Sequence, residues 1–464
     1  TQPAVVSPIF LRDSLRFNMF RTVTFLYMVF QVVALRGAEQ VASLIEDQYA
    51  DDAPVVKPSK VHNDTSFTEL SAQPVDSSES PEADPLKTAL PKKESKPLEL
   101  PKCSNGTLEL ESGTYEVTQL HKILEPCNVS SNGATLLLSA PVRFSKTARF
   151  EGKLFVKGLG SLAGPCFFFA EDAFIQSSAE MHFADCHNVA KSKPRSKGGA
   201  ISVRGNSNVT GNLSIHNCSA RLGGGISVNE NFEHLAGTIQ ISGSSAKSNG
   251  GGIYVEKSFT NSGGNIIISN SSAKSNGGGI CVNENFEHLA GTIQISGSSA
   301  KESGGGIYVE KSFTNSVGKI QISGSSAKRG GGICVNHKFA NSGGEIEISG
   351  SSAEAFGGGI FVEHNFANSG GNIQISGSSA EASGGGICVR DSFAHLGGSL
   401  SVSNSSTKKY GGGICVYGNA VFANATASFS QCHAQLEGGG MAIVRNVSLT
   451  NASLMFELAT AGDR

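Results

Sequence analysis

The sequence predicts an all-β fold, a right-handed parallel β-helix built from rungs about 27 residues long. The first observation is composition: 57 of the 464 residues are glycine and only 16% are charged, which indicates a repeat protein rather than an ordinary globular domain. The second is a glycine cluster that recurs at a nearly constant interval. The third is a pair of short stretches with period-two alternation in each repeat, without any helical period.

The glycine clusters define the repeat. Each cluster is followed by an aliphatic residue, and these residues are 25 to 27 positions apart. They are Ile201, Ile226, Ile253, Ile280, Ile307, Ile333, Ile360, Ile387, Ile414 and Met441. A representative unit, residues 250–276, reads GGGIYVEKSFTNSGGNIIISNSSAKSN, and residues 229–247 are identical to residues 283–301. Short strands at this period indicate one solenoid rung per repeat, each strand pairing in parallel with its equivalent in the next rung, with right-handed crossovers.

The alternation also predicts which side chains face inward. In residues 250–276 the inward set is Ile253, Val255, Phe259, Ile266 and Ile268. Equivalent residues of successive rungs then stack on one another. Five apolar side chains cannot offset the entropy of ordering a whole rung, so we expect the array to need neighbouring rungs and capped ends.

The first hundred residues have a different character. Basic residues precede an apolar run at 22–35 and small residues follow it, which is the pattern of a signal peptide within 1–38. The run is too short to cross a bilayer as a helix, so we expect a cleaved leader, with membrane contact through this segment only if it is retained. Residues 39–101 are rich in Pro, Ser and charged residues, which favours a disordered linker.

The rest of the chain is divided by the regularity of its repeats. Residues 102–197 contain irregular strand-like runs, which we interpret as an N-terminal cap with its first atypical rungs. Residues 198–444 hold the regular β-helix repeats, and residues 445–464 form a C-terminal tail.

Two outward columns are distinctive. The eighth repeat position runs Glu230, Lys257, Glu284, Lys311, His337, His364, Asp391, which predicts a ladder of mostly alternating charge. The fifth position runs Ser227, Tyr254, Cys281, Tyr308, Cys334, Phe361, Cys388, Cys415. This second column either forms an exposed aromatic strip for a ligand or is covered by another part of the chain.

The repeats resemble those of the chlamydial polymorphic outer-membrane proteins, which are marked by GGA[I/L] and FxxN motifs. GGAI at 198–201 matches the first motif, and the later copies read GGGI or GGGM. The second motif reads FxxC at 183–186 and 429–432, and IxxS in the inner rungs. The resemblance implies a β-helical passenger region and a role in adhesion to host cells. Only 20 residues follow Val444, so it extends to the passenger region alone.

A basic column is the candidate binding site. Four lysines occupy the same repeat position in successive rungs, and they are Lys247, Lys274, Lys301 and Lys328. Focused positive charge raises the local concentration of an anionic ligand, so this column could bind a sulfated or uronic polysaccharide. Solvated lysines at a turn are the alternative interpretation.

No catalytic residues or cofactor are predicted. Many parallel β-helices are polysaccharide lyases or hydrolases, whose chemistry needs clustered carboxylates. Glu354 and Glu381 are one rung apart and could be such a pair, but two solvated turn glutamates are the simpler interpretation. His337 and His364 also stack one rung apart, yet two ligands without a third do not make a metal site, so no metal is expected.

Ten cysteines in 464 residues are too dilute for a disulfide scaffold, but three pairings are candidates. Cys388 and Cys415 lie one rung apart, within the Cα separation that a disulfide allows. The other candidate pairs are Cys186 with Cys218, in successive rungs, and Cys103 with Cys127, which could staple the cap.

Sequons for N-glycosylation support an extracellular location. The candidate sites within the repeats are Asn208, Asn212, Asn217, Asn270, Asn404 and Asn424. Together with the leader, they predict a glycoprotein that is secreted or displayed on the cell surface.

The function expected from these features is non-catalytic: a β-helical protein that serves in binding, adhesion or structure. Glycans or cell-surface proteins are the expected partners. The 37 basic and 39 acidic residues give a net charge of −2, which leaves no basic surplus for nucleic acid. The alternative is a polysaccharide lyase or hydrolase of the parallel β-helix type.

Overall fold

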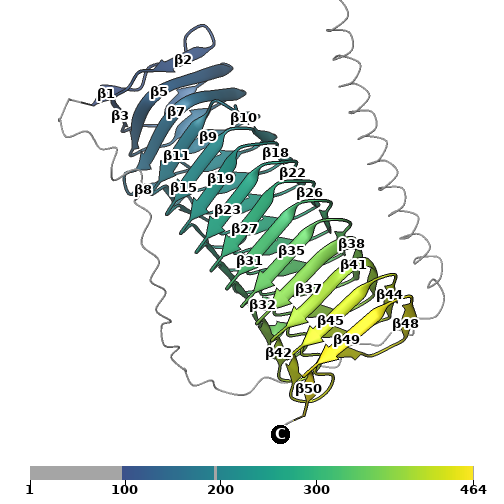
Figure 1. The fold of residues 1–464 in the computed structure, drawn as a ribbon. Helices are drawn as coiled ribbons and strands as arrows, with labels where there is room; N and C mark the ends of the chain where they lie inside the picture. The colour runs from purple at the N-terminus through teal and green to yellow at the C-terminus, as the bar shows by residue number, and fades with distance from the viewer. Residues whose placement is uncertain (1–96, 193–195, 463–464) are drawn as a thin grey trace, which may run out of the picture. The chain divides into compact units, whose positions relative to one another are not determined.

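The computed structural model describes residues 97–192 and 196–462. The chain divides into two units, Thr1–Ala83 and Asp84–Arg464, and all described residues lie in the second. That unit is a parallel β-solenoid, so the predicted β-helix is confirmed (Figure 1). The leader at 1–38 and nearly all of the linker at 39–101 lie outside the described residues.

Three parallel sheets form the walls of the solenoid, with 25, 13 and 12 strands; we call them sheets A, B and C. One rung shows the plan: β21 (Ile253–Val255) lies in sheet B, and β22 (Phe259–Asn261) and β23 (Asn265–Ser269) lie in sheet A. The rung closes with the two residues of β24 (Ser272–Ala273) in sheet C. Each strand pairs with its equivalent one rung away, Ile253 with Ile280 for example, so identical repeat positions form continuous columns.

Sheet C positions the candidate site, and its strands are very short because the rung turns sharply on both sides of them. In chain order they are β8 (Ser161–Leu162), β12 (His187–Asn188), β16 (Ser219–Ala220), β20 (Ser245–Ala246), β24, β28 (Ser299–Ala300), β32 (Ser326–Arg329), β36 (Ser352–Phe356), β39 (Ser379–Ala380), β42 (Ser406–Thr407), β46 (His433–Ala434) and β50 (Thr460–Ala461).

The core consists of the apolar columns that the alternation predicts. Ile253, Val255, Phe259, Ile266 and Ile268 all have an exposed fraction of 0%. Most successive phenylalanines stack face to face, with ring centroids 4.7 Å apart both between Phe232 and Phe259 and between Phe259 and Phe286. Each rung therefore buries its apolar side chains against the rungs on both sides, as neighbouring repeats in a solenoid do.

The glycine triplets are required by the tight turn from sheet C to sheet B. Gly250 has a φ of +69°, and a Cβ atom added there would lie 2.4 Å from the carbonyl oxygen of Ile253. A Cβ atom on Gly251 would lie 2.2 Å from the carbonyl oxygen of Gly278 in the next rung. Only glycine fits these positions, which explains why the triplet recurs with the rung.

An internal polar column runs beside the phenylalanines and was not predicted. It contains buried Asn and His side chains at the twelfth repeat position, namely His234, Asn261, His288, Asn315, Asn341, Asn368 and His395. The amide of Asn315 donates to the side-chain oxygen of Asn341, and Asn341 donates to that of Asn368, each over 3.1 Å. Their amides also donate to a carbonyl three residues ahead, so the column is held both along and across rungs.

The fifth-position column is buried, which decides between the two interpretations: it is covered by other parts of the chain and is not an exposed aromatic strip. Tyr254, Cys281, Tyr308, Cys334, Phe361, Cys388 and Cys415 form a second apolar cluster outside the main core. Side chains from the bend after sheet B and from the ends of sheet C strands close over it. Asn283 donates to the hydroxyl of Tyr254, Arg329 lies over the ring of Phe361, and Phe356 packs against the cluster.

Two predicted boundaries need correction. The strand β1 (Leu98–Glu99) pairs with β3 (Thr114–Val117), so the fold begins inside the predicted linker. Residues 445–464 are not a tail, because β48 (Val447–Thr450), β49 (Ser453–Glu457) and β50 complete the rung that begins at the last glycine cluster, in register with the previous rung. The glycine clusters placed the end of the array too early because they mark where a rung starts and not where it ends.

The segment 102–197 contains the irregular rungs expected of it. The long strands β5 (Cys127–Leu138) and β7 (Ala148–Gly158) pair with each other across one register shift, and β7 then pairs with β10 (Ala173–Ile175) and β11 (Glu180–Ala184). The region thus joins the same sheets as the regular rungs, which extend them without interruption (Figure 1).

Candidate functional site

The outer face of sheet C carries two parallel rows of polar side chains separated by small ones. In most regular rungs a serine is followed by a buried alanine and then by an exposed residue, as in Ser272, Ala273 and Lys274, whereas two later rungs have Ser406–Thr407 and His433–Ala434 in the first two places. The corner before the strand requires a left-handed residue, and Asn270 and Gly297 take this conformation with φ values of 50° and 57°. Because the strands share one register, the serines and the exposed residues stack into two columns along the solenoid.

The exposed column begins with five cations in successive rungs. Arg221, Lys247, Lys274, Lys301 and Lys328 all follow a Ser-Ala pair of sheet C, and all five are exposed. We call this set the basic column. The four predicted lysines therefore come together as expected. Arg221 was missed because the search was limited to lysine, although the SAR triplet at 219–221 carries the same signal as the SAK triplets.

The members of the basic column have no acidic partner, unlike several other lysines of the repeats. Lys257 pairs with Glu230 at 2.9 Å, Lys311 with Glu284 at 3.3 Å, and Lys319 with Glu345 at 3.2 Å. Among the residues that the structure describes, none of the five column cations forms an ion pair. The column is therefore a strip of uncompensated positive charge. Such a strip attracts anionic ligands.

The alternating charge ladder at the eighth position is present, and it shows that the repeat can neutralise its charges. The carboxylate of Glu230 raises the pKa of Lys257, which stabilises the charged ammonium. Further along, the rings of His337 and His364 stack with centroids 5.0 Å apart, and His364 Nδ1 lies 3.8 Å from a carboxylate oxygen of Asp391. In the described ranges no three His, Cys, Asp or Glu side chains are placed to share a metal ion.

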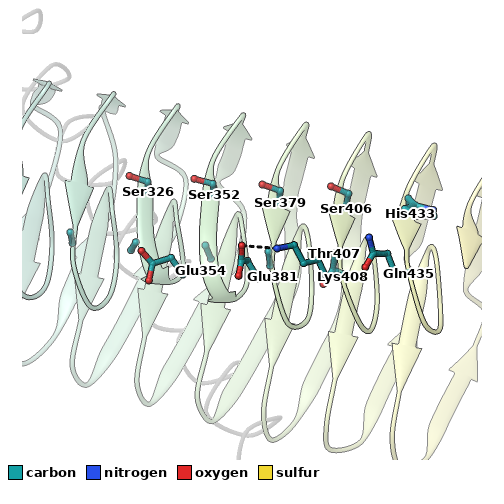
Figure 2. A pocket seen from close by; sticks show the side chains of 14 residues that line it. Ser326, Ser352, Glu354, Ser379, Glu381, Ser406, Thr407, Lys408, His433 and Gln435 are labelled. Carbon is teal, nitrogen blue, oxygen red and sulfur yellow. Dashed lines mark hydrogen bonds and ion pairs between the residues drawn. The ribbon is translucent and has the colours of Figure 1, made fainter. Parts of the chain in front are cut away.

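A groove open to solvent follows the basic column on the same face. Figure 2 shows the hydroxyl groups of Ser326, Ser352, Ser379 and Ser406 in one row, continued by His433. The second row holds Glu354, Glu381, Lys408 and Gln435, and the alanines between the rows line the groove as well. The exposed column thus changes from positive to mixed charge between Lys328 and Glu354.

The predicted carboxylate pair lies in this groove. Glu354 and Glu381 occupy neighbouring rungs. Glu381 is ion-paired to Lys408 at 2.9 Å, and about 60% of the Glu381 side chain and of the Lys408 side chain is exposed. Acid catalysis on a sugar requires a carboxyl group shielded enough to keep its proton near neutral pH. A solvated, lysine-paired carboxylate does not have that environment.

The cysteine pairings are partly corrected. Cys103 and Cys127 form a disulfide, as the sequence suggested. Cys186 is joined to Cys166 and not to Cys218, which is a buried free thiol. The reason is geometric: Cys166 occupies the third position of a glycine triplet, and a Cβ atom at the equivalent Gly413 would lie 3.4 Å from the sulfur of Cys432, the equivalent of Cys186.

The predicted disulfide between Cys388 and Cys415 is also absent, although the two residues are paired in adjacent strands. Both are buried free thiols in the second apolar cluster. Burial in that cluster and in the core raises the pKa of other cysteines; the pKa of Cys218 and that of Cys334 are each raised to about 12. The thiols of Cys218 and Cys334 therefore remain protonated at neutral pH and act as small apolar side chains.

Most of the predicted sequons lie on exposed turns. Asn217, Asn270 and Asn404 share the left-handed corner before sheet C, with φ values of 51°, 50° and 50°. Asn212 and Asn424 are exposed, and Asn208 is half-buried. Asn217 donates to a carboxylate oxygen of Asp185 at 2.7 Å, and Asn208 donates to Glu233 at 3.1 Å.

Compared with protein-family models, with curated proteins and with solved structures, the chain matches none. Within the described residues there is no helix long and apolar enough to cross a membrane.

Proposed function

We propose that this chain is a non-catalytic β-helical binding protein, secreted or displayed on the cell surface, that binds an anionic glycan along the basic column. The observation that carries the proposal is the row of five exposed cations without an acidic partner. Stacked like charges repel one another and weaken the fold. The same repeats avoid this cost at the eighth position by pairing Glu with Lys, so the unpaired column calls for a ligand that supplies the missing negative charge.

The extracellular location rests on the sequence. It is supported by the apolar run at 22–35 and by sequons that fall on exposed turns. The resemblance to chlamydial passenger repeats supports a role in adhesion. Peptide mass spectrometry of protein recovered from a secretory host tests the location: we expect cleavage near Ala38 and glycans on Asn270 and Asn404. Intact chain held inside the cells without glycans would contradict it.

Binding is tested with the full chain and a panel of acidic and neutral polysaccharides. We expect retention of the acidic polymers, no retention of the neutral ones, and weaker retention as salt rises, because screening weakens exposed charge interactions. Shortening of any polymer, seen by size-exclusion chromatography of the products, would contradict a non-catalytic protein and favour the lyase or hydrolase alternative.

A matched pair of variants assigns the binding to the column. In the first variant Lys247, Lys274, Lys301 and Lys328 are replaced by alanine. In the control the same four-charge change is made at Lys102, Lys122, Lys338 and Lys409, which lie elsewhere on the described surface. We expect loss of binding in the first variant alone. Equal loss in both would show that total charge, and not the column, is responsible.

A further inference from the structure

The spacing of the basic column restricts the kind of polymer that fits it. The pairing from Ser245 to Ser326 proceeds one residue to one residue, so the cations repeat at the distance between parallel strands, about 4.8 Å. This distance is close to the length of one sugar with its glycosidic bond in an extended polysaccharide. A glycan lying along the solenoid axis would therefore place about one sugar beside each rung.

The charge pattern then selects among anionic glycans. Every rung of the column supplies a cation, and no rung between Arg221 and Lys328 is skipped. A polymer with an anionic group on every sugar would pair with each of them. A polymer with an anion on every second sugar would leave alternate cations unpaired.

The serine row adds a second set of contacts. Ser245, Ser272, Ser299 and Ser326 are half-buried and stand two residues before the cations, on the same face of their strands. Their hydroxyl groups can donate to and accept from sugar hydroxyls. The buried alanines between the two rows leave no bulky side chain there, so a sugar ring can lie over the strands between the serines and the cations.

The ends of the column set the length of the site. Beyond Lys328 the same column continues with Glu354 and Glu381, whose negative charge opposes an anionic chain. In the rung before Arg221 the same repeat position, directly after β12, is occupied by Val189, which carries no charge. The uncompensated stretch therefore covers five rungs.

We propose that the ligand is a linear glycan of the homopolymeric uronic acid class, with one anionic group on every sugar; this inference rests on the proposed function. The glycan binds parallel to the solenoid axis, with one sugar per rung over about five sugars.

The experiment measures the affinity of the full chain for two series of oligosaccharides by calorimetry. The first series is oligogalacturonates of two to eight sugars, which carry a carboxylate on every sugar. The second is hyaluronan oligosaccharides, which carry a carboxylate on every second sugar. We expect affinity in the first series to rise until about five sugars and then level off. At equal total charge, the hyaluronan series should bind about tenfold more weakly, since alternate cations lose their partners.

The variants Lys274→Ala and Lys301→Ala, with Lys122→Ala in the cap as the control, separate the two proposals. Circular dichroism checks that each variant folds. If the column variants weaken binding about threefold or more each but affinity follows total charge alone in both series, the spacing proposal fails and the proposed function stands. If the column variants bind as tightly as the control, or if neither series binds, the proposed function fails together with this inference.

Discussion

At the scale of the residue, the position within the repeat decides the environment of each side chain. Asn and His at the twelfth position are surrounded by the core. Asn315, Asn341, Asn368 and His395 are tolerated there because they hydrogen-bond to one another along the column. Burying such groups without partners would be costly. A histidine in this column is held neutral, because burial lowers the pKa of His234 and that of His288 to about 4.

Acid should therefore destabilise the solenoid. An unfolded chain takes up protons on these histidines below about pH 6.5, whereas the folded chain does so only near pH 4. The contribution of the two neutral histidines to the free energy of unfolding is fully present above about pH 6.5. It falls as pH decreases toward 4, by about 1.4 kcal/mol per pH unit for each histidine. We expect the urea midpoint to fall across this window.

The control for this prediction is the double variant His234→Asn, His288→Asn, since asparagine already occupies the same column in other rungs. Its stability should depend less steeply on pH between 6.5 and 4. Equal slopes for the variant and the natural sequence would show that these histidines do not couple to folding.

The asparagine column should also contribute directly to stability. Replacing Asn341 by alanine removes its hydrogen bonds to Gly344 and Asn368 and leaves a buried acceptor unpaired. We expect a loss of about 1 to 3 kcal/mol in the free energy of unfolding, measured by urea denaturation. Gln374→Ala, on the exposed face of sheet A, should change it by less than about 0.5 kcal/mol. Similar effects from both would contradict a stabilising role for the column.

At the scale of the element, the regular strands need no covalent link, whereas the first rungs have two. Cys103–Cys127 and Cys166–Cys186 close segments with sequence separations of 24 and 20, and both lie in the irregular part of the solenoid. Fewer identical side chains stack on one another in these rungs, so the stacked columns contribute less to stability there. A disulfide compensates by limiting the unfolded chain.

Mapping of the disulfides tests this assignment. Mass spectrometry of unreduced peptides should find Cys103 linked to Cys127 and Cys166 linked to Cys186, with Cys218, Cys388 and Cys415 as free thiols. A peptide joining Cys186 to Cys218 would contradict the pairing within one rung and show that the disulfide links successive rungs. The variant Cys103→Ser, Cys127→Ser should lower stability by about 3 kcal/mol, with amide exchange increasing first in β1 to β5.

At the scale of the whole molecule, the repeat makes the solenoid modular. The strands of each rung pair only with those of the rungs before and after it. The identical copies 229–247 and 283–301 show that one sequence fits at different places in the stack. Stability in such a protein is a sum of rung and interface contributions. The length of the chain can therefore change in steps of one rung.

Deleting residues 277–303 joins Asn276 to Gly304 and removes one whole rung. We expect a folded protein about 4.8 Å shorter, measured by small-angle scattering and circular dichroism, with the basic column reduced to four cations. Deleting only residues 277–289 shifts every later position out of its column and should prevent folding of the rungs beyond. A folded product from this second deletion would contradict the column register.

The sequence by itself determined the fold class, the rung length, the apolar columns and four of the five cations of the basic column. It did so because a repeat of identical length places identical positions in contact, so Ile, Val and Phe could be assigned to the core from alternation alone. The same reasoning could not predict the buried Asn and His column, since polar residues beside a strand are expected to face water. The asparagines find their partners through stacking in the column and through a carbonyl three residues ahead, and both contacts depend on the closed rung.

The tertiary structure alone decided the contacts that depend on how the rung closes. It buried the fifth-position column beneath side chains from the bend after sheet B and from the ends of sheet C strands, because alternation says which face a side chain points to and not what covers that face. It joined Cys186 to Cys166, because the corner brings the third glycine position against the buried serine position of the same rung. It also showed which lysines have acidic partners, since ion pairing depends on the distances between neighbouring columns.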